Sequence, residues 1–327
     1  MTGVRTEEVA AADAGVRLDR WLKARLPGVP HGALLKLIRT GQVRINGGRA
    51  KHNQRLETGQ AVRIPPVSPR PDRKPGARPK AKVSKEDEEL LRSITLYQDD
   101  DIIALNKPPG LPVPGGTGTD RHLDGMLDAL AMDGERPRLV HRLDKDTSGV
   151  LVLARNAPAA RALTGSFRGR ETEKLYWGLV KGLPERYEGT IDLAIEKLPG
   201  KSGEKMVASK GGKRAITHYK LVEKAGLEAA WLAMMPITGR THQLRVHMAA
   251  IGTPIVGDGK YGGREAFLTG SISRNLHLHA RSITFPHPGK SGKVTVTAPL
   301  PRHMAATWKW LDFDESAGDI PASEFAP

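Results

Sequence analysis

The chain has 327 residues, enough for two or three domains with a substantial core. It contains no cysteine, which excludes a disulfide framework and a thiolate zinc site. Lysine and arginine total 51 against 36 acidic residues, and the net charge of +15 favours a polyanionic partner. No apolar run reaches the length of a membrane span, and the N-terminal stretch lacks the apolar core of a secretory signal, so we expect a cytoplasmic protein.

The N-terminal 64 residues read as a small domain of helices and short strands. Apolar residues recur on one stripe of residues 17–26 and again in residues 31–41, which predicts two short helices, the second ending at Gly41. A strand at 43–45, an Asn46-Gly47 turn and a strand at 61–64 follow. The helical stripes leave a set of cations free to face outward: Arg17, Arg20, Lys23, Lys36 and Arg39.

The run RLDRWL and the G-x-V-x-I-N-G run from Gly41 to Gly47 resemble the S4 RNA-binding domain. The resemblance implies that residues 1–64 bind structured RNA through those five cations. Twelve of the fifteen net positive charges lie in residues 1–84, a concentration that fits an RNA-binding arm. The alternative is a basic tail with no specific partner.

Residues 65–84 contain six prolines and interspersed basic residues, which predicts an extended linker. Ser84 and Asp87 have the spacing of a helix capping box, and a large domain is expected over residues 85–311. The acidic residues 312–327 look like a solvated tail.

Apolar runs in the large domain predict more strands than helices. A helix is expected at 157–167, and strands at 102–105, 150–154, 174–180, 215–222, 229–235, 282–285 and 294–298. Because strands seldom alternate with helices, we expect an α+β fold with a mixed, largely antiparallel sheet rather than a doubly wound fold.

The segment HRLDKDTSG, residues 141–149, lies between two apolar runs. Arg and Asp two residues apart in a loop are usually a solvated ion pair. The longer string resembles the HRLD-x-x-TSG signature of the RluA/RluC-type ribosomal large-subunit pseudouridine synthases, in which it carries the catalytic aspartate. That resemblance assigns the role to Asp144 and implies the same α+β fold.

A second segment, residues 238–262, also resembles that family, and its helix carries Leu244 on an apolar stripe. His242 and His247 are five residues apart, the wrong spacing for two metal ligands on one helical face, so no metal is expected. His277 and His279 are expected to be surface or core residues rather than ligands. GGTG at 115–118 lacks the following Lys-Ser or Lys-Thr of a phosphate loop and is interpreted as a flexible loop.

The resemblance implies that Arg240 pairs with Asp144 and that Tyr176 stacks on the extruded uracil. A plain strand aromatic is the alternative for Tyr176. Arg142 would fill the gap left by the flipped nucleotide. Leu244 would line the pocket, although core packing explains it equally well.

The isomerisation of uridine needs no cofactor, and none is expected. Within the family, the S4-like domain and the GGTG-containing segment before HRLD look most like the RluC branch acting on 23S rRNA. The resemblance therefore implies an RNA pseudouridine synthase with that substrate, and we expect a monomer. Two alternatives stay open: a synthase acting on tRNA, and a non-catalytic S4-type ribosome assembly or RNA-binding factor. A methyltransferase is disfavoured because no glycine-rich turn offers a cofactor pocket.

Overall fold

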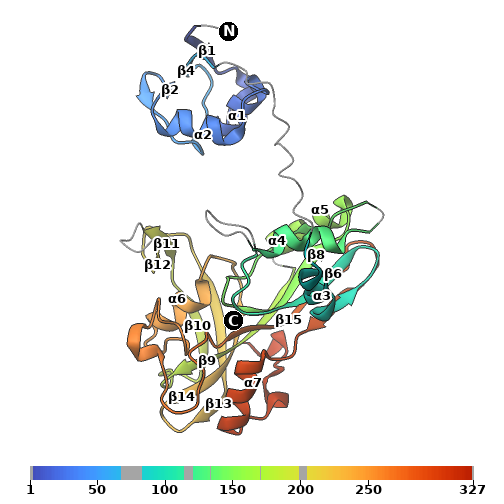
Figure 1. Cartoon of the computed structure of the whole chain (residues 1–327). Helices are drawn as coiled ribbons and strands as arrows, with labels where there is room; N and C mark the ends of the chain where they lie inside the picture. The colour runs from blue at the N-terminus through green and yellow to red at the C-terminus, as the bar shows by residue number, and fades with distance from the viewer. Residues whose placement is uncertain are drawn as a thin grey trace. The chain divides into compact units, whose positions relative to one another are not determined.

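The computed structural model describes residues 3–67, 83–113, 121–132, 134–169, 171–198 and 205–325. The chain divides into two compact units, residues 1–82 and residues 83–327 (Figure 1). Most of the predicted linker and the GGTG segment at 115–118 lie outside the described residues. No helix in the described ranges is both long and apolar enough to cross a membrane.

The first unit pairs two helices with a four-stranded antiparallel sheet of order β1-β4-β2-β3. Its elements are β1 (Arg5–Glu8), α1 (Leu18–Arg25), α2 (His31–Arg39), β2 (Arg44–Ile45), β3 (Gly48–Arg49) and β4 (Ala61–Ile64). Asn46 and Gly47 both have positive φ, as a two-residue hairpin turn requires. The two predicted helices and the hairpin are confirmed.

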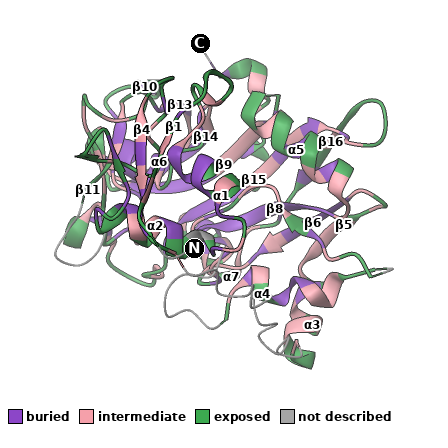
Figure 2. Cartoon of the chain, turned by 90° about the horizontal axis from the view of Figure 1, so that it is seen from above, coloured by how far each residue is buried: buried purple, intermediate pink, exposed green. Residues whose placement is uncertain are grey.

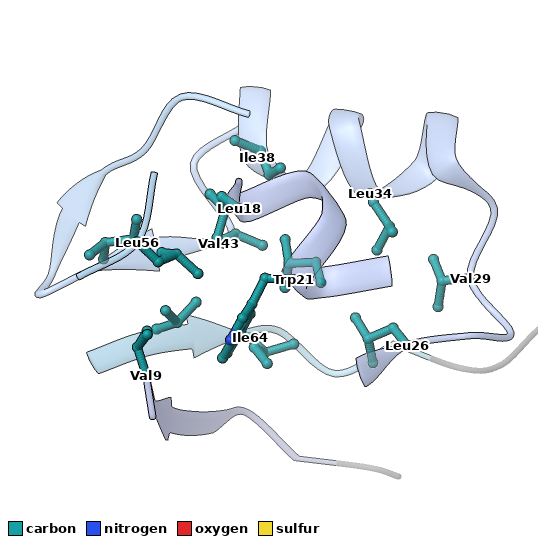
Figure 3. Close-up of a cluster of buried hydrophobic side chains, with 13 residues drawn as sticks. Val9, Leu18, Trp21, Leu26, Val29, Leu34, Ile38, Val43, Leu56 and Ile64 are labelled. Atoms are coloured by element: carbon teal, nitrogen blue, oxygen red, sulfur yellow. The ribbon is translucent and has the colours of Figure 1, made fainter. Parts of the chain in front are cut away.

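Buried apolar side chains from the helices and the sheet meet in one core (Figure 3). Trp21 and Leu18 of α1 are buried completely or almost so, as is Leu34 of α2. The cations lie outside this core: Arg20, Lys23, Lys36 and Arg39 are exposed, and Arg17 is bound to Asp19 by two hydrogen bonds. The apolar stripes of the two helices therefore face the core, and the charged residues lie outside it. The identification of this unit as an S4 domain is still a prediction.

The second unit is built on a ten-stranded sheet. Its helices are α3 (Lys85–Ser93), α4 (Leu123–Met126), α5 (Ala157–Gly169), α6 (Gln243–Ala250) and α7 (Arg302–Leu311). Its strands are β5 (Thr95–Gln98), β6 (Ile102–Lys107), β7 (Arg138–Leu139), β8 (Ser148–Ala154), β9 (Glu173–Lys181), β10 (Glu188–Asp192), β11 (Ile195–Leu198), β12 (Lys205–Ala208), β13 (Ile216–Ala225), β14 (Ala229–Pro236), β15 (Leu278–Pro286) and β16 (Lys293–Thr297). As predicted, the Ser84 side chain caps α3 by accepting a hydrogen bond from the backbone N–H of Asp87.

The main strand order is β10-β13-β14-β9-β15-β8-β6-β5, with β16 added beside β15 and β7 beside β8. Only β15 and β8 run parallel among the described pairs, so the predicted mixed, largely antiparallel α+β fold is confirmed. β11 and β12 form a separate hairpin.

Every residue of strand β8 is buried (Figure 2), because apolar clusters cover both faces of the sheet at this strand. Leu151 and Leu153 pack in the cluster that includes α4, while Val150 and Val152 pack in the cluster that includes α5. The strand is thus a rigid base for the loop that precedes it.

The expectation of a solvated C-terminal tail is wrong. Phe313 and Phe325 are buried, and the indole N–H of Trp177 donates to the Gly318 carbonyl oxygen at 2.8 Å. Any Cβ at Gly318 would collide with the ring of Trp231. The prediction rested on the acidic composition of this segment and overlooked its few apolar residues, which pack into the core beside α7.

Candidate active site

A cavity of about 530 Å³ opens where four segments of the second unit meet. We call residues 141–149 the Asp144 loop and this cavity the Asp144 pocket. Its walls come from the Asp144 loop, the end of α5, strand β9, and the turn that leads into α6. Every residue predicted for the catalytic site lines it: Arg142, Asp144, Tyr176, Arg240 and Leu244.

The Asp144 loop is anchored at both ends. The ring of His141 stacks on Phe167 with centroids 4.5 Å apart, and its Nε2 accepts the backbone N–H of Val152 at 2.8 Å. Burial, with a smaller contribution from the charge of Lys174, lowers the pKa of His141 to about 3, so this ring is a neutral acceptor. At the other end Gly149 has φ 109°, and a Cβ there would collide with the Ala280 carbonyl.

A buried lysine ties the same loop to β6. The ammonium of Lys107 donates to the carbonyl oxygens of Pro108, Leu111 and Lys145 at 2.8, 3.1 and 3.0 Å. Burial lowers the pKa of Lys107 to about 7, against the opposing charges of Asp146 and Asp144. Sequence analysis did not single out Lys107 and missed this contact with the loop.

The Asp144 side chain is 20% exposed and faces the pocket. His242 Nε2 lies 3.8 Å from Asp144 Oδ2, which is the contact with a basic side chain that the described residues provide for Asp144. The carboxylate is therefore held in the pocket without a short salt bridge that would neutralise it.

Tyr176 lies on β9 beside Asp144. Burial, and then the negative charge of Asp144, raise the pKa of its phenol above the usual value, so the hydroxyl stays protonated near neutral pH. The ring is half-buried and packs against two apolar clusters as well as lining the pocket. Leu244 is similarly shared, because it is 6% exposed, lines the pocket and packs with Met248 in the core.

The predicted pairing of Arg240 with Asp144 is not formed. Arg240 is exposed at the pocket rim, and its Nε donates to the Arg214 carbonyl oxygen at 3.2 Å. The backbone N–H of Arg240 donates to Gln243 Oε1 at 3.1 Å, which fixes the turn ahead of α6. This turn directs the Arg240 side chain along the rim.

A different arginine lies within the pocket wall. Arg245 is 7% exposed, and its Nε and Nη2 each donate to a carboxylate oxygen of Asp258 at 2.7 Å. Burial alone would lower the pKa of Arg245, but the bonds to Asp258 and the charges of Asp258 and Asp144 together raise it. Arg245 is thus a buried, permanently charged group whose field acts on Asp144, and sequence analysis did not single it out.

His247 of the second motif, and His277 and His279 near the start of β15, make hydrogen bonds inside the protein. His247 bonds to Thr217, His277 bonds to Thr307 and the Asn275 carbonyl oxygen, and His279 bonds to Ser148. Over the described ranges, no cluster of three or more His, Asp or Glu side chains is arranged to hold a metal ion.

Comparisons with known proteins agree on one family. The family model described as RNA pseudouridylate synthase matches residues 101–250. The chain is 37% identical over 308 residues to a ribosomal large subunit pseudouridine synthase C of Salmonella typhi, covering 92% of this chain and 94% of that protein. It is 39% identical to the protein of the same name from Haemophilus ducreyi, covering 89% and 91% of the two chains.

Among solved structures, the human RNA pseudouridylate synthase domain containing 4 aligns with a TM-score of 0.59 and 29% identity. The alignment covers 69% of this chain and 97% of the human one. The human protein thus matches only part of this chain, whereas the bacterial relatives match it along nearly its whole length.

Proposed function

The chain belongs to the RNA pseudouridylate synthase family, and we propose that it isomerises specific uridines of 23S ribosomal RNA to pseudouridine in the Asp144 pocket. As a member of this family it is a pseudouridine synthase. One observation carries the assignment of the site: residues far apart in the sequence, on the Asp144 loop, β9 and α6, line a single cavity. The relatives named as ribosomal large subunit synthases support rRNA as the substrate.

The reaction breaks the bond from the ribose C1′ to N1 of uracil and makes a bond from C1′ to C5. C5 then loses its proton and N1 gains one, so the product is an isomer with no redox change. We propose Asp144 as the group that acts on the nucleotide, either as a nucleophile or as a base. Its half-buried carboxylate in the pocket wall supports that role.

We propose that the Tyr176 ring stacks on the extruded uracil and that its neutral hydroxyl handles a proton. Extrusion is needed because the glycosidic bond cannot be reached inside a base stack. Arg142 is exposed at the pocket and would occupy the space that the flipped nucleotide leaves. Leu244 would close the apolar side of the pocket.

The two arginines take different roles in this proposal. Arg245 supplies a fixed positive charge near Asp144, because its Nε and Nη2 both donate hydrogen bonds to Asp258. Arg240, at the rim, binds a phosphate of the RNA strand that enters the pocket. The half-buried Arg17 and the exposed Arg20, Lys23, Lys36 and Arg39 of the first unit add further phosphate contacts. We also propose that the enzyme acts in the cytoplasm and as a monomer.

The test maps pseudouridines in rRNA and tRNA from cells that lack the gene and from the same cells supplied with the full chain or with Asp144→Asn. We expect one or more positions in 23S rRNA to be modified with the full chain and unmodified with the variant. If pseudouridines disappear without the gene and return with the full chain only in tRNA, the substrate is tRNA and not rRNA. An unchanged map in both RNAs would favour a non-catalytic binding factor.

A further inference from the structure

His242 has a backbone conformation that is uncommon for a residue other than glycine. It immediately precedes α6 with φ 55° and ψ 22°, in the left-handed region, and its carbonyl oxygen accepts the N–H of Val246. A residue at this position normally has an extended backbone and caps the helix with its side chain. The His242 side chain makes no capping hydrogen bond, so helix capping does not explain this conformation.

The other two non-glycine residues with positive φ in the described ranges have ordinary explanations. Asn46 forms the hairpin turn between β2 and β3, and Asp312 ends α7. Asparagine, aspartate and histidine all adopt this conformation more often than most residues, so what sets His242 apart is that it neither forms a hairpin turn nor ends a helix. Strain of this kind persists only where the surroundings hold it, and it is concentrated at functional sites.

The conformation directs the imidazole between two side chains. Nδ1 lies 2.6 Å from the Tyr261 hydroxyl, and Nε2 lies 3.8 Å from Asp144 Oδ2. The Tyr261 oxygen also accepts the backbone N–H of Met206 at 3.4 Å, and its hydroxyl is placed to donate to Nδ1 of His242. With Nδ1 as the acceptor, the ring proton is on Nε2 and points toward the carboxylate.

Charged groups from three directions act on this ring. Asp144 faces it from the loop, Arg245 from α6, and Asp258, Lys260 and Tyr261 from the segment after α6. Burial is the largest effect and lowers the pKa of His242, while Asp144 opposes that change. The imidazole is therefore neutral near pH 7 and acts as an N–H donor rather than as a cation.

We propose that His242 is a positioning residue that donates its Nε2–H to the Asp144 carboxylate, with Tyr261 selecting the tautomer. The separation of 3.8 Å is longer than a hydrogen bond, and such contacts commonly tighten when substrate binds. The donor orients one carboxylate oxygen and leaves the other free for the nucleotide. This inference rests on the proposed function, because it assigns a partner to the proposed catalytic carboxylate.

The test uses the full chain and two substitutions suited to a left-handed backbone. His242→Asn and His242→Gly both tolerate positive φ, and the glycine variant relieves the strain. Tyr261→Phe removes the hydroxyl and leaves the ring. His218→Gln is the matched control, because His218 on β13 is half-buried and bonded to Thr190 away from the pocket walls.

The measurements are the single-turnover rate of tritium release from 5-tritiated rRNA across pH, the affinity for that RNA, and the thermal midpoint. We expect His242→Asn and His242→Gly to fold and bind RNA like the wild type. Their rates should fall by about ten- to a hundredfold, the scale of a lost hydrogen bond to a charged group. The acidic limb of the rate profile should move to higher pH, because the carboxylate has lost a donor. Tyr261→Phe should lower the rate and move the acidic limb in the same direction, each by less than the His242 variants do. His218→Gln should change neither the rate nor the acidic limb.

A structural role would lower the rate by the same factor at every pH, together with the thermal midpoint, and would contradict the inference. Wild-type rates and profiles in both His242 variants would also overturn it while leaving the proposed function intact. Absence of tritium release from the wild-type enzyme itself, on rRNA from cells lacking the gene, would instead remove the proposed function and this inference with it.

Discussion

The two compact units differ in whether the cations with a proposed role are exposed or buried. In the first unit, apolar residues fill the core, and cations such as Lys36 and Arg39 are exposed on the helices. In the second, Lys107 and Arg245 are buried, and each is bound by partners that fix its position near Asp144. Exposed cations act additively and are screened by salt, whereas buried ones act at one point and depend on their partners. We propose that this difference separates RNA affinity, in the first unit, from chemistry, in the second.

The largest expected effect is that of Asp144→Asn. The amide keeps the shape of the side chain but has neither the charge nor the basicity of the carboxylate. Turnover should fall by roughly 100- to 10,000-fold or below detection, the scale of a lost acid or base group, while RNA affinity stays within a few-fold of the wild type. Tritium release and filter binding on the same RNA check this, and appreciable residual turnover would remove Asp144 from its role.

The second prediction concerns the buried ion pair. Asp258→Asn leaves the Arg245 charge buried and half-partnered, which should cost about 3 kcal/mol of unfolding free energy as well as lowering turnover. The matched control is Asp192→Asn, since Asp192 also binds an arginine, Arg214, by hydrogen bonds from two nitrogen atoms but on the exposed surface. The control should leave the denaturant midpoint unchanged. Equal losses in the two variants would mean that burial does not distinguish these pairs.

A third prediction tests the first unit by itself. Replacing Arg20, Lys36 and Arg39 together by glutamine should weaken binding to large rRNA and reduce the slope of log affinity against log salt by about 0.7 to 0.9 per lost phosphate contact. The single-turnover rate at saturating RNA should fall far less than in Asp144→Asn. Affinity titrations over a salt series measure the slope. An unaltered slope would show that these cations do not touch RNA phosphates.

The smallest effect is a pH dependence of stability from Lys107. Its pKa is about 7 in the folded state, below the ordinary value of 10.5, so between these values the unfolded chain binds more protons than the folded one. Folding stability should therefore rise with pH in that window, by at most about 1.4 kcal/mol per unit, relative to Lys107→Met. Urea unfolding of both proteins at pH 7, 8 and 9 gives the difference. A constant difference would mean that Lys107 titrates at its ordinary value.

The sequence predicted those parts of the structure that local patterns determine. The continuous apolar run of β8 and the stripes of α1 and α2 are visible without a fold, because each is specified by its own residues. Strand β1 was missed, since Arg5–Glu8 contains no apolar residue and becomes a strand by pairing with β4. The packed C-terminal segment was also missed, because its contacts are with Trp177 and Trp231, far away in the chain.

The same dependence on distant contacts explains why the sequence analysis chose Arg240 as the partner of Asp144 and overlooked Arg245. Residues 238–245 contain two arginines at a helix start, and nothing local distinguishes them. The left-handed backbone of His242 sets how the preceding turn meets α6, and Arg240 lies along the rim while Arg245 is bound by Asp258. Both features depend on tertiary contacts that the motif does not encode.

The most direct measurement of the central claim follows a reaction that releases a proton from C5 but adds nothing to the RNA. Purified full-length wild-type chain is incubated with 23S rRNA from cells lacking the gene. Tritium release is counted from 5-tritiated uridine, and the mass of unlabelled fragments is compared before and after. The account predicts stoichiometric tritium release at specific uridines with no change in fragment mass. Release accompanied by an increase in mass, as in methylation at C5, or no release at all, would contradict it.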